Sequence, residues 1–144
     1  MKSAVCLLLA AILISSTAAA ERPQILPDPM LVNLYALTEA AAALRICAES
    51  SRFDTLSASE KDQLQRLQGL IEELVHNIAR KFDDDLFPFF VASRNEAAAR
   101  PDKIEDMRMR YDFCTNGFID RMKAYVYDSR RKLDYFLSEQ PDAK

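Results

Sequence analysis

The amino-acid sequence predicts an all-α protein, folded as a four-helix up-down bundle with one disulfide. Only two glycines, Gly69 and Gly117, occur in the 144-residue chain. Between the prolines, apolar residues recur at helical rather than alternating spacing. Short connections between such segments favour antiparallel neighbours, which gives the up-down arrangement. Removal of the predicted export signal leaves two cysteines, Cys47 and Cys114. Two cysteines in an oxidising compartment usually form a disulfide.

The N-terminus has the pattern of a cleaved signal peptide. Lys2 gives a positive start, an apolar run covers residues 4–14, and three alanines end at Ala20 as a small-residue cleavage site. This run is too short to anchor the chain in a bilayer, and we expect no transmembrane anchor further along. The sequence therefore predicts a cleaved signal over 1–20, one helical domain over 21–140, a polar tail over 141–144, and a periplasmic or secreted location.

The charge balance argues against nucleic acid as a partner. The chain has 19 basic and 22 acidic residues and a formal net charge of −3, and loss of Lys2 with the signal makes the mature chain more acidic. Binding to phosphates needs a concentrated basic surface, which this composition does not supply.

The first helix is expected over 28–51 and should lie at the centre of the bundle. Asp28 followed by Pro29 is a good start signal, with the aspartate as N-cap and the proline at the first helical position. The apolar residues that follow, including four alanines over 40–43, surround most of the helix circumference. A helix that is apolar on nearly all sides belongs in a protein interior.

The second helix is expected over 57–82, where Ser57 and Glu60 have the spacing of a capping box. Its apolar residues form one stripe, which should pack on the first helix. The stripe consists of Leu64, Leu67, Ile71, Leu74, Val75, Ile78 and Phe82.

The third helix is expected over 86–100, after the acidic triplet 83–85. The triplet lacks the alternating ligands and the glycine of an EF-hand loop, so we expect it to cap the helix rather than bind calcium. Pro88 is tolerated in the first turn, and the aromatic residues of this helix should cover one end of the core.

The last segment keeps its helical pattern from Asp102, which forms another capping-box pair with Glu105, to about residue 138. A straight helix of this length would be roughly 54 Å long, more than the preceding helices can cover. Asn116-Gly117 is the place with the chemistry for a break, because both residues tolerate a left-handed backbone. The long C-terminal helix is therefore expected to be either straight or kinked there.

One face of this last segment carries Cys114 together with most of its apolar residues. At 100° per residue, Met107, Cys114 and Phe118 point the same way, toward the core. This orientation supports pairing of Cys114 with Cys47 on the central helix. In the chain-entropy model, a crosslink over that span is worth about 4 kcal/mol.

A second face of the same segment carries candidate protein-binding residues. If the helix is continuous, these lie nearly opposite the core face: Met109, Phe113, Tyr127, Arg131 and Tyr135. Two interpretations stay open. In the first, other parts of the chain cover this face, or its aromatic residues are merely scattered over the surface. In the second, the face binds a partner or a second copy, since aromatic, methionine and arginine side chains are favoured at interface centres.

The sequence predicts no catalytic residues, metal site or cofactor. Glu73 and His76 have the Glu-x-x-His spacing of di-iron bundles, but such a site needs a second copy and the chain has one histidine. We expect His76 to lie on the surface beside Glu72 or Glu73. The serines lack a glycine elbow and a suitable base, so enzyme activity is not expected.

These features favour a small exported, non-catalytic protein that binds another envelope or secreted protein, as an inhibitor, immunity factor or assembly accessory does. One alternative is a periplasmic carrier of a small ligand or metal, with the aromatics of the last two helices lining its pocket. Another is an acid- or stress-responsive chaperone. Contact with a membrane surface through residues 130–132 is not expected, because Asp128 and Asp134 lie beside these basic residues.

Overall fold

The computed structural model describes residues 26–115 and 117–139, and it contains helices and turns but no strand within these two ranges. In chain order the elements are α1 (Asp28–Glu49), the 3₁₀ helix η1 (Ser51–Thr55), α2 (Ala58–Lys81), α3 (Leu86–Ala99), α4 (Pro101–Tyr111) and α5 (Phe118–Glu139). The predicted all-α class and the Cys47–Cys114 disulfide are confirmed. The expected signal over 1–20 and tail over 141–144 lie outside the described residues.

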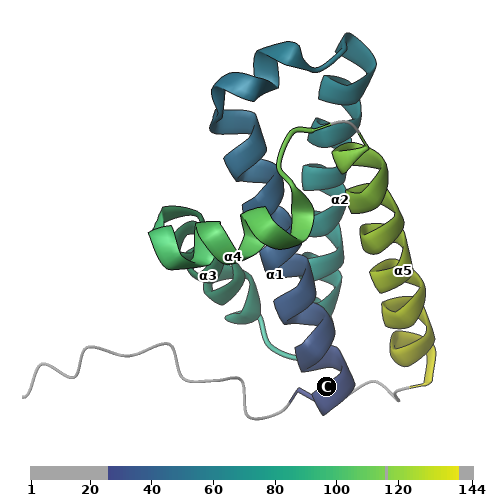
Figure 1. The fold of residues 1–144 in the computed structure, drawn as a ribbon. Helices are drawn as coiled ribbons and strands as arrows, with labels where there is room; N and C mark the ends of the chain where they lie inside the picture. The colour runs from purple at the N-terminus through teal and green to yellow at the C-terminus, as the bar shows by residue number, and fades with distance from the viewer. Residues whose placement is uncertain (1–25, 116, 140–144) are drawn as a thin grey trace, which may run out of the picture.

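The helices pack around α1, which contacts each of the other four α-helices (Figure 1). The long helices α1, α2 and α5 lie side by side, whereas α3 packs on α1 and α2, and α4 crosses α1 (Figure 1). α2 and α5 are neighbours that run in the same direction, and the Lys81 ammonium donates to the Leu137 carbonyl at 2.5 Å where both helices end (Figure 1). Neighbours in an up-down bundle are antiparallel, so that predicted arrangement is not confirmed.

The central position of α1 follows from its composition. Its alanines over 40–43 are buried and let neighbouring helices approach closely, and Leu34, Leu37 and Leu44 are fully buried. The helix starts at Asp28, but Pro27 occupies the N-cap position and the Asp28 side chain makes no capping hydrogen bond, which corrects the predicted N-cap. Pro29 in the first turn costs no hydrogen bond there.

α1 is also long and apolar enough to cross a membrane, judged by length and composition alone. This finding corrects the expectation that no stretch after the signal meets that criterion. The core helix of a bundle meets the same criterion, and 61% of the most apolar window of α1 is buried here.

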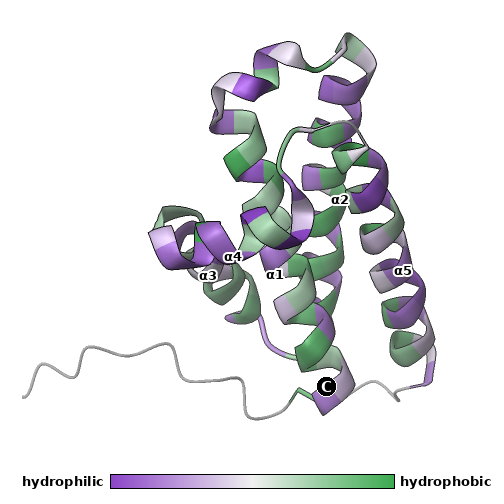
Figure 2. Cartoon of the chain, in the orientation of Figure 1, coloured by the Kyte–Doolittle hydropathy of each residue, from purple (hydrophilic) through white to green (hydrophobic). Residues whose placement is uncertain are grey.

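The start of α2 matches the prediction. The Ser57 hydroxyl accepts a hydrogen bond from the Glu60 backbone N–H at 3.2 Å, and the Glu60 carboxylate accepts one from the Ser57 backbone N–H at 2.8 Å. Hydrogen bonds to the Glu60 carboxylate from the backbone and then the side chain of Ser57 lower the pKa of Glu60. The predicted apolar stripe is buried except for Phe82, which is half-buried at the C-cap. Figure 2 shows the matching division of α5 into a hydrophilic outer side and a hydrophobic inner side.

The acidic triplet precedes α3, although not as the predicted side-chain cap. Asp85 occupies the N-cap position without a capping hydrogen bond from its side chain. The Asp83 carboxylate instead accepts from the Asp85 backbone N–H at 2.9 Å, which tightens the turn into the helix. Within α3, Leu86 and Phe90 are buried in the core.

The predicted capping box at the start of the next helix is wrong. α4 begins with Pro101 at its first position and Arg100 at the N-cap, so Asp102 is already inside the first turn. The Arg100 guanidinium donates to Asp102 at 2.7 Å, and the Arg108 guanidinium donates to Glu105 at 2.6 Å. Both carboxylates are thus engaged by arginines, which lower the pKa of each.

The predicted long C-terminal helix is two helices, α4 and α5, and the described residues between them, 112–115 and 117, form a turn. Asp112 and Cys114 have positive φ values of 50° and 55°, and Gly117 has a φ of 79°. The break therefore begins at Asp112, earlier than the predicted Asn116-Gly117, of which Asn116 lies outside the described residues. L-residues other than asparagine and aspartate rarely enter the left-handed region, so Cys114 needs support from its surroundings.

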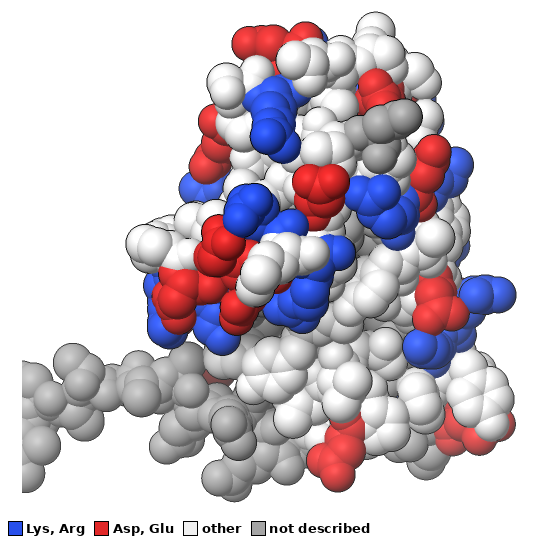
Figure 3. All heavy atoms as spheres, in the orientation of Figure 1, with Lys and Arg blue, Asp and Glu red and all other residues white. Residues whose placement is uncertain are grey.

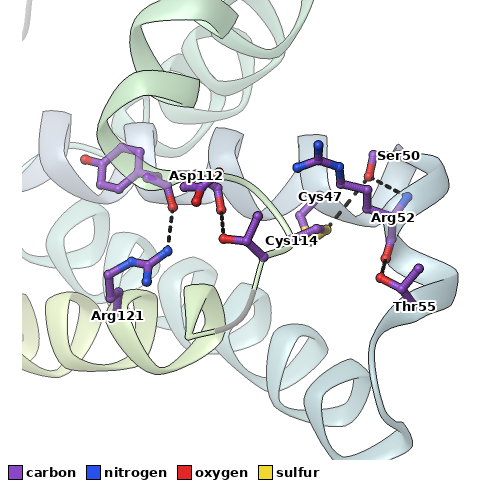
Figure 4. The surroundings of a disulfide bond; sticks show 9 residues. Cys47, Ser50, Arg52, Thr55, Asp112, Cys114 and Arg121 are labelled. Carbon is purple, nitrogen blue, oxygen red and sulfur yellow. Dashed lines mark hydrogen bonds between the residues drawn. A yellow bond between two sulfur atoms is a disulfide. The ribbon is translucent and has the colours of Figure 1, made fainter.

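That support comes from the disulfide and the residues around it (Figure 4). The Cα atoms of Cys47 and Cys114 are 5.3 Å apart, which ties the turn to the last turn of α1. The Thr115 hydroxyl donates to the Asp112 carbonyl at 2.7 Å, and the Arg121 guanidinium donates to the Tyr111 carbonyl at 3.0 Å (Figure 4). The turn thus has fixed connections to both helices that it joins and to α1.

Candidate functional site

The five candidate protein-binding residues do not form one surface. Met109 lies on α4 and is 70% exposed, whereas Tyr127 and Tyr135 lie on α5 and are 46% and 59% exposed. α4 packs on α1 and α3, while α5 packs on α1 and α2. The helix break thus places Met109 in a different part of the molecule from the residues of α5.

Phe113 is a correction to the predicted surface. It lies in the turn between α4 and α5, is only 8% exposed, and packs edge-to-face against Phe118 with 6.1 Å between ring centroids. The prediction placed Phe113 opposite the core because it assumed one continuous helix. Once the chain leaves the helical path at Asp112, that geometry no longer applies, and the ring turns into the core.

Three of the predicted residues remain together on α5. The exposed Arg131 guanidinium donates to the Asp128 carboxylate at 3.0 Å. Tyr135 makes an edge-to-face contact with Phe136, with 5.7 Å between ring centroids. Tyr127 differs from both, because it lines a groove shared with another helix.

This groove runs between α2 and α5 and has a volume of 550 Å³. Leu67 and Leu70 of α2 supply its apolar residues together with Tyr127 of α5. The complete lining comprises Ser59, Asp62, Gln63, Arg66, Leu67, Leu70, Lys123, Tyr127 and Arg130.

The contribution of α2 to this groove was not predicted from the sequence. The packing of α5 beside the polar residues of α2 cannot be deduced from the periodicity of α2 alone. One signal was present, because Leu70 lies next to the apolar stripe rather than within it and remains half-buried. An apolar residue beside a stripe of this kind widens the apolar face toward a neighbouring helix.

The groove has more basic groups than its own carboxylates can pair. Arg66 contacts Asp62 at 2.8 Å, and both side chains line the groove. Arg130 is 3.8 Å from Asp134, which does not line it. Lys123 has no ion pair or hydrogen bond with any described residue.

A second cavity, with a volume of 340 Å³, lies between α1, α3 and α4. Its charged groups are largely paired: Arg110 forms an ion pair with Glu39, and Arg100 contacts Glu96 at 3.4 Å. Figure 3 shows acidic and basic side chains intermingled over α4. The lining comprises Tyr35, Thr38, Glu39, Ser93, Glu96, Ala97, Arg100, Lys103, Met107 and Arg110.

Near this cavity, Tyr111 and Tyr125 form an edge-to-face pair with 6.4 Å between ring centroids. Burial, followed by repulsion from Glu39, raises the pKa of Tyr111 to about 12 and also raises the pKa of Tyr125. Both phenols therefore keep their protons at neutral pH. Neutral phenols of this kind serve as hydrogen-bonding groups rather than as general bases.

His76 is exposed, as predicted, but it makes a different contact from the one expected. Its ring stacks on Phe87, with 3.7 Å between ring centroids, while Glu72 forms an ion pair with Arg94 at 3.1 Å. In the described part of the chain, no group of three or more His, Cys, Asp or Glu side chains could hold a metal ion.

Comparison with known proteins gives no relative, since no family model, curated protein or solved structure matches this chain. The function proposed below therefore rests on the geometry of the molecule.

Proposed function

We propose that this chain is an exported, non-catalytic helical protein that binds another envelope or secreted protein through α5 and the adjoining groove. The signal pattern over 1–20 and the disulfide between Cys47 and Cys114 support export, because disulfides persist in oxidising compartments. The proposed role is that of an inhibitor, immunity factor or assembly accessory.

The observation that carries the proposal is the position of Tyr127. Its ring is 46% exposed, yet it stands at a groove that also contains Leu67 and Leu70. A partner side chain placed there would contact apolar surface from two helices at once. Partly exposed aromatic side chains beside a depression are typical anchors of protein interfaces.

The small-ligand carrier has weaker support. Its pocket was expected to be lined by aromatic residues from the last two helices, but Tyr35 of α1 is the one aromatic residue lining the cavity between α1, α3 and α4. The remaining lining is mostly polar or charged, whereas small-molecule sites are predominantly apolar. No specific observation favours the acid-responsive chaperone.

The test is affinity capture from a cell-envelope extract with the mature chain as bait. Tyr127→Asp with Tyr135→Asp should abolish capture of a stoichiometric protein partner, because loss of an interface anchor costs about 2 kcal/mol or more. A matched control, Val32→Asp with Met109→Asp, alters two exposed apolar residues on α1 and α4 and should retain the partner.

Circular dichroism and an intact disulfide must first show that all variants fold. Capture of no stoichiometric partner, or equal loss in both double variants, would contradict the proposal.

A further inference from the structure

We infer that the groove between α2 and α5 receives an acidic, amphipathic segment of the partner protein. Apolar side chains of that segment would contact Leu70 and Tyr127, and its carboxylates would face the basic groups at the groove. The inference rests on the proposed function, since it specifies the partner chemistry for the same surface.

Charge complementarity is the first support for this partner. The groove is lined by Arg66, Lys123 and Arg130 but by a single carboxylate, Asp62. The whole chain, in contrast, has a net charge of −3. A local excess of positive charge attracts an acidic segment.

The second support is that two of the three basic groups, Lys123 and Arg130, lack a close carboxylate partner among the described residues. Lys123 has no partner within residues 26–115 and 117–139, so its ammonium can bind a carboxylate without breaking an existing pair. The 3.8 Å separation of Arg130 from Asp134 is too long for a hydrogen bond. Both groups lie on α5, near Tyr127, so charge and apolar contact coincide.

The shape of the groove favours an extended or helical segment over a small molecule. Side chains from two neighbouring parallel helices line it along more than two turns of α2, from Ser59 to Leu70. An amphipathic helix recognises such a surface by placing its apolar face in the groove and its polar face at the rims.

An anionic membrane surface fits these residues less well. Arg131 and Lys132, next to Arg130, both pair with Asp128, at 3.0 Å and 2.8 Å. Asp134 lies beside the same groups on α5. A lipid surface pressed against this helix would meet these carboxylates, whereas a protein segment confined to the groove would avoid them.

Site-specific photocrosslinking tests the inference with the full mature chain in a cell-envelope preparation. A photoreactive benzoylphenylalanine replaces Gln63, which lines the groove, or Tyr135, which lies on α5 but does not line it. Mass spectrometry then identifies the crosslinked segment. We expect a crosslink from position 63 to a segment with net negative charge.

Charge reversal supplies the matched comparison. Lys123→Glu with Arg130→Glu should reduce the crosslink at position 63 on the order of tenfold, because it replaces attraction by repulsion. Lys103→Glu with Arg108→Glu makes the same change in net charge on α4 and should leave the yield unchanged. Circular dichroism and the intact disulfide verify that both variants fold.

The outcomes separate this inference from the proposed function. A protein crosslink from position 135 but none from position 63 would overturn the inference and leave the proposed function standing. A neutral or basic segment, a phospholipid adduct, or equal loss in the two charge-reversal variants would also overturn the inference. Absence of protein crosslinks from both positions would contradict the inference and the proposed function together.

Discussion

The groove between α2 and α5 and the cavity between α1, α3 and α4 are each lined by three basic residues, but these residues are paired differently. In the cavity, Arg100 and Arg110 each contact a carboxylate that also lines it. In the groove, Arg66 alone has such a partner. Charge is thus largely balanced within the cavity and left in excess within the groove.

This difference shows that the number of basic residues in a cleft does not by itself determine how much of their charge is balanced. Glu39 and Glu96 reach the cavity because α1, α3 and α4 meet there. Where α5 packs beside α2, Asp62 is the single carboxylate in the lining. The charge available to a partner therefore depends on which helices become neighbours.

The largest expected effect concerns the disulfide, which holds the turn between α4, a helix of the cavity, and α5, a helix of the groove. Reduction should lower the free energy of unfolding by about 4 kcal/mol, because it restores the freedom of a long loop in the unfolded chain. Urea unfolding of the oxidised and reduced protein measures this loss. Equal midpoints would contradict it, and a Cys47→Ala, Cys114→Ala variant should not respond to the reductant.

A second effect separates the interior from the groove surface. Phe113→Ala should lower the free energy of unfolding by about 3 kcal/mol, because it empties a buried site against Phe118. Tyr127→Ala should change it by no more than about 0.5 kcal/mol, because the ring is half exposed. Urea unfolding with the disulfide intact compares the two variants, and similar losses would show that Tyr127 is structural.

The tyrosine pair beside the cavity should make stability fall at alkaline pH. Tyr111 has a pKa of about 12 in the folded protein against 10.0 for an ordinary tyrosine, so its contribution is complete below pH 10.0. As pH rises from there toward 12, the unfolded chain releases the proton first and stability decreases, by about 1 kcal/mol after allowance for solvent screening.

Urea unfolding on either side of pH 10.0 measures this alkaline loss. Tyr111→Phe should diminish it. Glu39→Gln should lower the pKa of Tyr111, because it removes a nearby negative charge. An unchanged alkaline loss in Tyr111→Phe would assign the effect to another group.

The smallest expected effect on stability tests whether basic residues are paired with carboxylates in the cavity but not in the groove. Glu39→Gln in the cavity should cost about 0.5 kcal/mol, the usual size for a partly exposed ion pair, because it removes the partner of Arg110. Lys123→Ala in the groove should cost less, because Lys123 pairs with no described residue. Thermal unfolding at low ionic strength is the sensitive measurement, and a larger loss for Lys123→Ala would reverse the comparison.

Local patterns predicted those parts of the fold that depend on neighbouring residues. The Ser57–Glu60 capping box, the buried stripe of α2 and the apolar circumference of α1 all follow from spacing along one helix. The inward orientation of Cys114 was also predicted, and it survives the break because the cysteine is held by α1.

A break was predicted as one of two alternatives, at Asn116-Gly117. Its start at Asp112 could not be predicted, because the helical period continues past that residue and no proline interrupts it. Tertiary contacts, with a disulfide and two buried phenylalanines, determine the backbone there. The candidate site was predicted in part for a related reason. Tyr127 could be identified on one helix, but Leu70 and Arg66 join it through the packing of α2 against α5.

The disulfide also turns part of the chain into a covalent ring. The segment from Cys47 to Cys114 contains α2, α3 and α4, and α5 continues from the ring. A protease that cuts once inside this segment opens the ring without separating the molecule into two pieces. A single cut within α5, or within α1 before Cys47, would in contrast produce a fragment with no covalent link to the rest. The helix proposed to bind the partner therefore lies outside the protection that the ring provides.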